Sequence, residues 1–95
     1  MADPPAPPAR PDLYVVARFL DRLAEPGAAY TRSRLQLAVR LNYDLFRSYL
    51  ALLQRRGLVE VVEVGGREVV RATPAGVEAD RELGAWIRRM LDEGP

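Results

Sequence analysis

The sequence contains neither cysteine nor histidine among its 95 residues. Without cysteine, the chain has no disulfides, no thiolate chemistry and no soft metal site. Without histidine, it lacks the most common general base and a frequent zinc ligand. The carboxylates that remain are spread over alternating strand positions and outer helix positions, with no converging pair. We therefore expect a protein that is not an enzyme and that binds no cofactor and no metal ion.

Long apolar stretches are also missing. The longest, Leu13–Ala17 and Leu50–Leu53, fall far short of the ~20 residues that a membrane span needs. The N-terminus is rich in proline and lacks the basic end and apolar stretch of a signal peptide. We expect a cytoplasmic protein with no membrane partner. The chain length allows a single domain with a small core.

Lysine is absent, so all fourteen basic residues are arginines, and the net charge is +1. Residues 29–57 hold six arginines and one acid, Asp44, for a net charge of +5. Residues 1–28 hold three arginines and four acids, and residues 58–95 hold five arginines and eight acids. A genome rich in G and C would explain the preference for arginine, but not this clustering. Arginine forms two-pronged hydrogen bonds to phosphate and to guanine, so the basic middle third indicates a polyanionic partner.

Cap residues and hydrophobic spacing predict four helices and one hairpin. Residues 1–11 hold five of the eight prolines, and we expect them to form a disordered tail. The predicted elements are a helix near 12–24 capped by Asp12, a helix of eight or nine residues after the cap Thr31, a helix from Tyr43 to about Arg56 capped by Asn42, strands over 58–64 and 67–72 joined by Gly65-Gly66, and a helix from 74 to about 93 capped by Thr73.

The apolar positions of the first three helices predict the core. They are Leu13, Val16, Phe19, Leu20 and Leu23 in the first helix, Leu35, Leu37, Ala38 and Leu41 in the second, and Phe46, Leu50 and Leu53, with Tyr49 beside them, in the third.

The order of these elements predicts the fold class. Two helices joined by about three residues, with a hairpin behind them, are typical of a winged helix-turn-helix. We expect an α+β fold that is mainly α, with a three-helix core, a two-stranded wing and a long C-terminal helix. The predicted DNA-binding domain covers residues 12–73, and the last helix, residues 74–95, is the predicted dimerisation element.

The outer face of the third helix carries the predicted base contacts. In a helix-turn-helix the second helix of the pair enters the major groove. With the apolar stripe facing the core, the opposite face carries two arginines, a hydroxyl, a small residue and one acid. Arg47 and Ser48 are the candidates for base edges, Asp44 for cytosine or the helix start, Ala51 for a thymine methyl group and Arg55 for phosphate. An ordinary solvated helix face is the alternative interpretation.

Further phosphate contacts are predicted at the start of the second helix and at the wing. A helix N-terminus with free N–H groups, hydroxyls and arginines is suited to phosphate, which favours Arg32, Ser33 and Arg34. Arg67 follows the Gly-Gly tip and is a candidate for backbone or minor-groove contact. Glu63 and Glu68 flank the tip and oppose that contact.

The last helix carries an apolar stripe that suits dimerisation. Its members recur at helical spacing beyond the segment that closes the core, and they are Leu83, Trp86, Ile87, Met90 and Leu91. Packing on the first helix of the same chain is the alternative, and one broad stripe can serve both neighbours.

Several motifs together resemble the small archaeal winged helix-turn-helix proteins over about residues 13–80. They are the helix start Thr31–Leu35, the turn Leu41-Asn42-Tyr43-Asp44, the stretch Tyr49-Leu50-Ala51-Leu52-Leu53, the Gly57-Leu58-Val59 that precedes the hairpin, and the helix start Val70-Arg71-Ala72-Thr73-Pro74-Ala75-Gly76. This resemblance implies DNA binding by transcriptional regulators or chromatin-like proteins. It also implies dimers built through the final helix.

The function expected from the sequence is a double-stranded DNA-binding transcriptional regulator that acts as a homodimer and uses residues 43–56 as its recognition helix. A DNA-binding protein of chromatin-like or architectural type, without sequence preference, is one alternative. A winged-helix module that binds another protein is the other, because fold alone does not decide between these functions.

Overall fold

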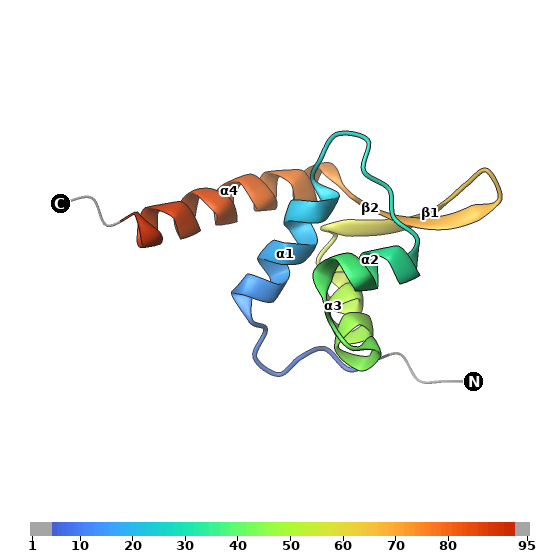
Figure 1. Cartoon of the computed structure of the whole chain (residues 1–95), viewed down its shortest axis with the longest axis horizontal. Helices are drawn as coiled ribbons and strands as arrows, with labels where there is room; N and C mark the ends of the chain where they lie inside the picture. The colour runs from blue at the N-terminus through green and yellow to red at the C-terminus, as the bar shows by residue number, and fades with distance from the viewer. Residues whose placement is uncertain (1–4, 93–95) are drawn as a thin grey trace.

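The computed structural model describes residues 5–92. Its elements, in chain order, are α1 (Leu13–Leu23), α2 (Arg32–Val39), α3 (Tyr43–Arg55), β1 (Val59–Val64), β2 (Arg67–Ala72) and α4 (Pro74–Leu91) (Figure 1). All six were predicted in this order, and their ends differ from the predicted ends by at most two residues. Within the described residues, no helix is both long enough and apolar enough to cross a bilayer.

Each helix begins at its predicted cap residue. The cap side chain accepts a hydrogen bond from a backbone N–H of the first turn, which would otherwise lack a partner inside the helix. The four bonds run from Tyr14 N to Asp12 Oδ1 (2.8 Å), from Arg34 N to Thr31 Oγ1 (3.3 Å), from Leu45 N to Asn42 Oδ1 (2.9 Å) and from Gly76 N to Thr73 Oγ1 (3.0 Å).

The wing is an antiparallel hairpin whose register runs from Val59 opposite Ala72 to Val64 opposite Arg67. The Gly65-Gly66 turn has φ values of 59° and 78°, which glycine adopts without steric cost and which suit a two-residue hairpin turn. Tyr30, just ahead of α2, also pairs with Val70 of β2 through two backbone hydrogen bonds of 3.0 and 2.7 Å. No motif in the chain indicates this bridge, which ties the start of α2 to the wing.

The core lies where α1, α2, α3 and the wing meet, and it is centred on stacked aromatic rings. The ring of Phe19 lies 5.7 Å from that of Phe46 and 6.2 Å from that of Tyr49. The other buried apolar residues are Leu20, Leu23, Leu35, Val39, Leu50, Leu53, Val59 and Val70.

Two predicted core positions are wrong. Leu37 is 79% exposed and Leu13 is 52% exposed, while Val39, which was not predicted, is fully buried. In α2 the inner face is set by Leu35 and Val39, four residues apart and therefore one above the other. Leu37 lies about 200° around the helix from Leu35, at about 100° per residue, and so points away from the core.

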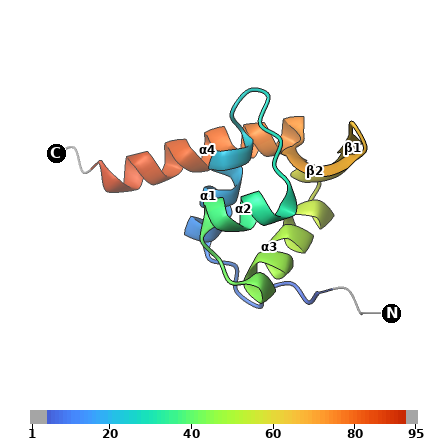
Figure 2. The ribbon, with the colours of Figure 1, turned by 45° about the vertical axis from the view of Figure 1, so that its right-hand side comes forward.

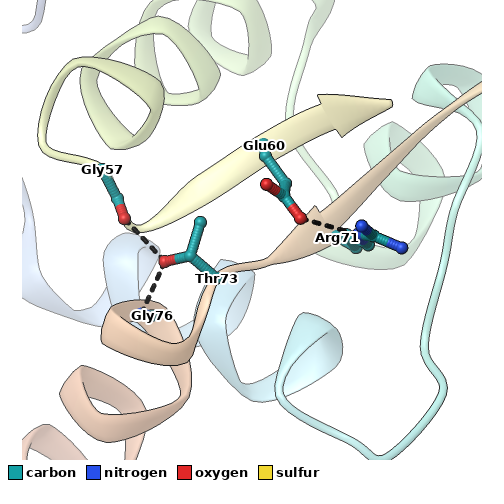
Figure 3. Close-up of polar contacts among 5 residues, drawn as sticks. All are labelled: Gly57, Glu60, Arg71, Thr73 and Gly76. Carbon is teal, nitrogen blue, oxygen red and sulfur yellow. Dashed lines mark hydrogen bonds and ion pairs between the residues drawn. The ribbon is translucent and has the colours of Figure 1, made fainter. Parts of the chain in front are cut away.

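The start of α4 is fixed to the end of α3. The Thr73 hydroxyl donates to the Gly57 carbonyl (2.6 Å), as Figure 3 shows, and the Thr73 amide donates to the Leu58 carbonyl (3.0 Å). Gly76 is buried directly above that Leu58 carbonyl, where a Cβ atom would collide with the oxygen. From this junction α4 packs across α1 and extends beyond the remaining elements (Figures 1 and 2).

These elements form a winged helix-turn-helix of α+β class that is mainly helical, as the sequence predicts. Residues 5–11 carry neither helix nor strand and lead into the cap of α1. The expectation of a disordered tail over residues 1–11 stays a prediction, and its first four residues lie outside the described part. The last three residues of the predicted C-terminal element, 93–95, also lie outside it.

The close approach at Gly76 predicts a position-dependent effect of alanine in α4. We expect Gly76→Ala to destabilise the fold by about 1–3 kcal/mol, because the Leu58 carbonyl belongs to the backbone and cannot move aside cheaply. Gly84→Ala is the matched control, since its Cβ would meet only the end of the Arg88 side chain at 3.4 Å. That variant should gain about 0.5–1 kcal/mol from helix propensity. Urea unfolding followed by circular dichroism measures both, and equal effects of the two variants would contradict this packing.

Candidate nucleic-acid interface

The turn between α2 and α3 sets the direction of α3. Arg40 ends α2 in the left-handed conformation with φ 57° and donates its amide to the Gln36 and Leu37 carbonyls. Such a backbone conformation is uncommon for residues other than glycine and asparagine, so the surrounding bonds must hold it. The Gln36 side chain also donates to the Leu41 carbonyl (3.3 Å), and Asn42 then caps α3. The sequence predicted the position of this turn but not its left-handed residue.

The face of α3 opposite the core carries the five predicted base and phosphate contacts. Asp44 and Arg55 are exposed, whereas Arg47, Ser48 and Ala51 are partly buried. Among residues 5–92, neither Arg47 nor Arg55 pairs with a carboxylate. Arg55 instead donates from Nη2 to the Pro5 carbonyl (3.1 Å). The outer face of α3 therefore keeps its positive charge free of internal salt bridges.

Tyr43 is a member of this face that the sequence analysis missed. Its ring is 60% exposed, and the Arg47 guanidinium lies over it, 5.5 Å from the ring centre. The two residues are four apart on one helix, which is the spacing at which side chains meet. This spacing of four residues is visible in the sequence and could have predicted the contact between Tyr43 and Arg47. A cation–π contact of this kind is worth about 0.5–1 kcal/mol at an exposed site and limits the directions in which Arg47 extends.

Arg32, a predicted phosphate contact, is engaged within the protein. Its Nε donates to Glu68 Oε1 of β2 at 3.0 Å, and both side chains are at least half exposed. An exposed pair of this kind contributes between about 0 and 1 kcal/mol, so a phosphate can compete for Arg32. The pair also links the start of α2 to the wing.

Arg34 and Arg67 come together in one hollow, although 33 positions separate them in the sequence. The hollow has a volume of about 380 Å³ and lies between the start of α2 and the wing, where Thr31 and Val64 also line it. No acidic residue lines it. Ser33 is exposed in the first turn of α2. Two predicted phosphate contacts thus line one hollow whose lining contains no acid.

Ion pairing leaves the middle of the chain strongly basic. Three salt bridges are found within residues 5–92, and they join Arg32 to Glu68, Arg71 to Glu60 (Figure 3) and Arg81 to Glu78. Of the six arginines in residues 29–57, only Arg32 is paired with a carboxylate of the described part of the chain. Apart from Glu68 with Arg32, the acids of the wing and of α4 within the described residues therefore do not pair with the helix-turn-helix.

The predicted dimerisation stripe lies on the far half of α4. Trp86, Met90 and Leu91 are 48%, 59% and 67% exposed, and Leu83 and Ile87 are partly buried. All five belong to the second half of α4, and the end of that helix extends past α1 (Figure 1). Packing within one chain thus leaves much of the stripe uncovered.

Acidic residues gather instead between α1 and α4. Asp21 and Asp80 line a hollow of about 340 Å³ together with Arg81 and Arg88. Partial burial raises the pKa of Asp80, the negative charge of Asp21 adds to the rise, and Arg88 opposes it. No group of three or more histidine, cysteine, aspartate or glutamate side chains within the described residues is arranged to hold a metal ion.

No family model matches this chain, and no curated protein matches it in sequence. Solved structures do match its fold. Sso10a-2, a DNA-binding protein from Sulfolobus solfataricus, superimposes with a TM-score of 0.72 over 87% of this chain and 84% of its own length, at 16% identity. At that identity the likeness shows the fold alone.

Two bacterial regulators are more similar in sequence. The transcriptional regulator PcaV from Streptomyces coelicolor has a TM-score of 0.68 and 31% identity over 81% of this chain. The MarR family transcriptional regulator SPO1453 from Silicibacter pomeroyi has a TM-score of 0.66 and 25% identity over 79% of this chain. This chain spans only 58% of PcaV and 54% of SPO1453. The structural neighbours are thus winged-helix DNA-binding proteins and regulators of MarR type, and they include archaeal proteins.

The environment of Asp80 predicts a pH-dependent effect on stability. Because its pKa is raised in the folded chain above the ordinary 3.8, ionised Asp80 opposes folding once the pH exceeds that folded pKa. Asp80→Asn removes this cost, so the variant should be more stable than the natural protein at pH 7. The advantage should shrink as the pH falls toward 3.8 and should be absent below it. Thermal unfolding at several pH values measures the difference.

Glu82→Gln is the control for that experiment, because Glu82 is an exposed carboxylate on the same helix. Its stability should stay within about 0.5 kcal/mol of the natural protein. A lower stability of Asp80→Asn at pH 7 would show that the carboxylate is stabilising there, against this account.

Proposed function

We propose that this protein is a double-stranded DNA-binding transcriptional regulator of the winged helix-turn-helix class, related to the small archaeal proteins that its motifs resemble. The observation that carries the proposal is the outer face of α3, whose arginines have no carboxylate partners among residues 5–92, together with the acid-free hollow of Arg34 and Arg67. The neighbours Sso10a-2 and PcaV, a DNA-binding protein and a transcriptional regulator, support the same function. DNA as the partner agrees with a cytoplasmic location and with a protein that is not an enzyme.

In this proposal α3 lies in the major groove. Arg47 forms a two-pronged contact with O6 and N7 of a guanine. Before α3 enters the groove, the Arg47 guanidinium lies over the ring of Tyr43. Ser48 donates to or accepts from a neighbouring base edge, and Ala51 touches a thymine methyl group. Asp44 accepts from a cytosine amino group or remains at the helix start, where its charge suits the helix dipole.

Phosphates are held on both sides of that helix. Arg55 lies near the C-terminal end of α3, and the hollow formed by Arg34 and Arg67 lies toward the wing. Ser33 and the free N–H groups of the first turn of α2 add neutral donors. Arg32 joins them when a phosphate displaces Glu68. These contacts position the helix, and the base contacts supply sequence preference.

The protein acts as a homodimer in this proposal, with the stripe of Leu83, Trp86, Ile87, Met90 and Leu91 buried against a second copy. Covering Trp86 and Met90 would contribute about 1.5–3 kcal/mol each before the cost of association. A two-fold dimer places two α3 helices on one duplex, with half-sites one helical turn or a multiple apart.

A DNA-binding protein of architectural type is the second candidate. Sso10a-2, which this chain covers over 84% of its length, is a DNA-binding protein whose name states no regulatory role, so it agrees with this function as well. A comparison of affinity for mixed-sequence duplex with affinity for duplexes selected by the protein separates the two functions. A regulator prefers its selected site by at least about 10³, whereas an architectural protein does not.

Duplex binding by α3 predicts a loss of affinity in the double variant Arg47→Ala, Ser48→Ala. Removal of a two-pronged base contact costs about 1–3 kcal/mol per protomer, so a selected duplex should be bound at least tenfold more weakly. Arg22→Ala is the charge-matched control, because Arg22 is exposed in the last turn of α1 and is unpaired within the described residues. Gel-shift titration measures all three proteins.

The salt dependence provides the second readout of that titration. If about four phosphates are contacted per protomer, the slope of log K against log salt is near −7 for a dimer. A slope near zero would contradict DNA binding altogether. Retention of a protein partner without any duplex binding would favour a protein-interaction module instead.

The exposed stripe of α4 predicts that the oligomeric state depends on Trp86 and Met90. The natural protein should sediment at about twice the chain mass of 10.6 kDa. The double variant Trp86→Ala, Met90→Ala should sediment as a monomer at the same concentration. Leu37→Ala, which removes an even more exposed apolar side chain from α2, should leave the dimer intact. A monomeric natural protein would contradict the dimer proposal but would leave the proposed role of α3 as the DNA-contacting helix unaffected.

A further inference from the structure

The proline-rich segment formed by residues 5–11 lies against the C-terminal half of α3. Arg55 Nη2 donates to the Pro5 carbonyl at 3.1 Å, across 50 positions of sequence. A hollow of about 410 Å³ separates the two, lined by Pro7, Pro8, Ala9 and Pro11 on one side and by Leu52, Arg55 and Arg56 on the other. Figures 1 and 2 both show this part of the chain passing beside α3 before it enters α1.

The end of this segment is fixed to the core. The Asp12 amide donates to the Tyr49 hydroxyl at 2.8 Å, and Tyr49 is buried against Phe19. The Asp12 carboxylate at the same time caps α1. Four of the seven residues in the segment are prolines, whose fixed φ limits the conformations available to it. The segment is therefore stiff and is held at one end beside the proposed recognition helix.

The charged residues that line this hollow are both arginines. Arg55 and Arg56 line it, and no acidic residue does. Arg10 lies between two of its lining residues, is exposed and pairs with no carboxylate within residues 5–92. The hollow between α1 and α4, in contrast, has two aspartates in its lining. Two arginines in an acid-free lining, with a third arginine on the segment itself, suit an anion of the phosphate type.

We propose that the proline-rich segment is a DNA-contacting arm, which stays seated against α3 and places Arg10 beside Arg55 and Arg56 on the phosphate backbone that flanks the recognition helix. This inference rests on the proposed function. The hollow of Arg34 and Arg67 lies toward the wing, and the arm supplies a second arginine cluster at the C-terminal half of α3. A helix in the major groove has a phosphate backbone on either side, so two clusters match the two strands.

The opposite role, an inhibitory cover over α3, fits the observations less well. A segment that occupies a DNA-binding face in place of DNA would be expected to carry negative charge, and residues 5–11 contain no acid and one arginine. Arg55 uses one N–H for the Pro5 carbonyl, and a guanidinium has five donors, so it can hold the arm and a phosphate together.

The arm is tested by Arg10→Ala in the full-length chain, with Arg22→Ala as the charge-matched control on the far end of α1. Removal of one phosphate contact per protomer should make the slope of log K against log salt less steep by about 0.9 for each protomer. Affinity for a mixed-sequence duplex at about 0.1 M salt should fall roughly five- to tenfold for each phosphate that is no longer bound. Arg22→Ala should change neither quantity.

The outcomes separate this inference from the proposed function. If the natural protein fails to bind duplex, both are wrong. If it binds duplex and Arg47→Ala weakens it while Arg10→Ala behaves as Arg22→Ala does, the arm alone is wrong. A chain that lacks residues 2–10 should bind more weakly than the natural protein, and tighter binding by that chain would establish an inhibitory cover instead.

A spin-label measurement, which does not depend on affinity, tests whether the arm stays against α3 when DNA binds. Because the chain has no cysteine, Ala9→Cys provides a unique site for a spin label. The label should broaden the amide signals of the C-terminal half of α3 both in the free protein and in the duplex complex. Loss of that broadening when duplex is added would show that DNA displaces the arm, which overturns the proposal.

Discussion

The packing of Phe46 on Phe19 sets the orientation of α3, on which the position of the proposed DNA-binding face depends. The ring of Phe46 stacks on that of Phe19, with Leu50 and Leu53 along the same stripe of α3. Once that stripe is buried, the turn of about 100° per residue leaves Asp44, Ser48 and Ala51 on the opposite side of the helix. Tyr49 belongs to the same aromatic cluster, and its hydroxyl accepts a hydrogen bond from the Asp12 amide. This bond places the N-terminal segment beside α3. The same aromatic contacts thus determine which face of α3 points outward and where residues 5–11 lie beside it.

Charge is separated in space as well as in sequence. Two arginine-lined hollows without acids flank the helix-turn-helix, one at the wing and one at residues 5–11, while Asp21 and Asp80 lie between α1 and α4. The exposed apolar stripe is on α4 and not on α3. In the proposed function a polyanion and a second copy of the chain therefore use different surfaces and do not compete.

The sequence predicted the local structure well because local chemistry determines it. Asp12, Thr31, Asn42 and Thr73 cap the helices as their side chains and positions indicate, and Gly65-Gly66 turns the hairpin. The exposure of Leu37 was missed because an eight-residue helix has barely two turns in which to establish a hydrophobic period. The left-handed Arg40 was missed because arginine gives no signal for that conformation.

Contacts between distant parts of the chain could not be predicted. The pairing of Arg32 with Glu68, the meeting of Arg34 with Arg67 and the bond from Arg55 to Pro5 join residues more than thirty positions apart. Nothing in residue type or spacing determines them, since they follow from where the wing and the first residues lie after the core has packed. Proline-rich composition has no hydrophobic period, so it led to the expectation of a disordered tail over residues 1–11 and gave no sign of the surface beside which residues 5–11 lie.

The central claim is that the outer face of α3 contacts duplex DNA. The most direct measurement is a map of amide chemical-shift changes in the isotope-labelled protein as a short duplex is added. This account predicts that the largest changes fall within Tyr43–Arg55, at the first turn of α2 and near Arg67, with few in the second half of α4. Changes concentrated in α4, with α3 unaffected, would contradict it.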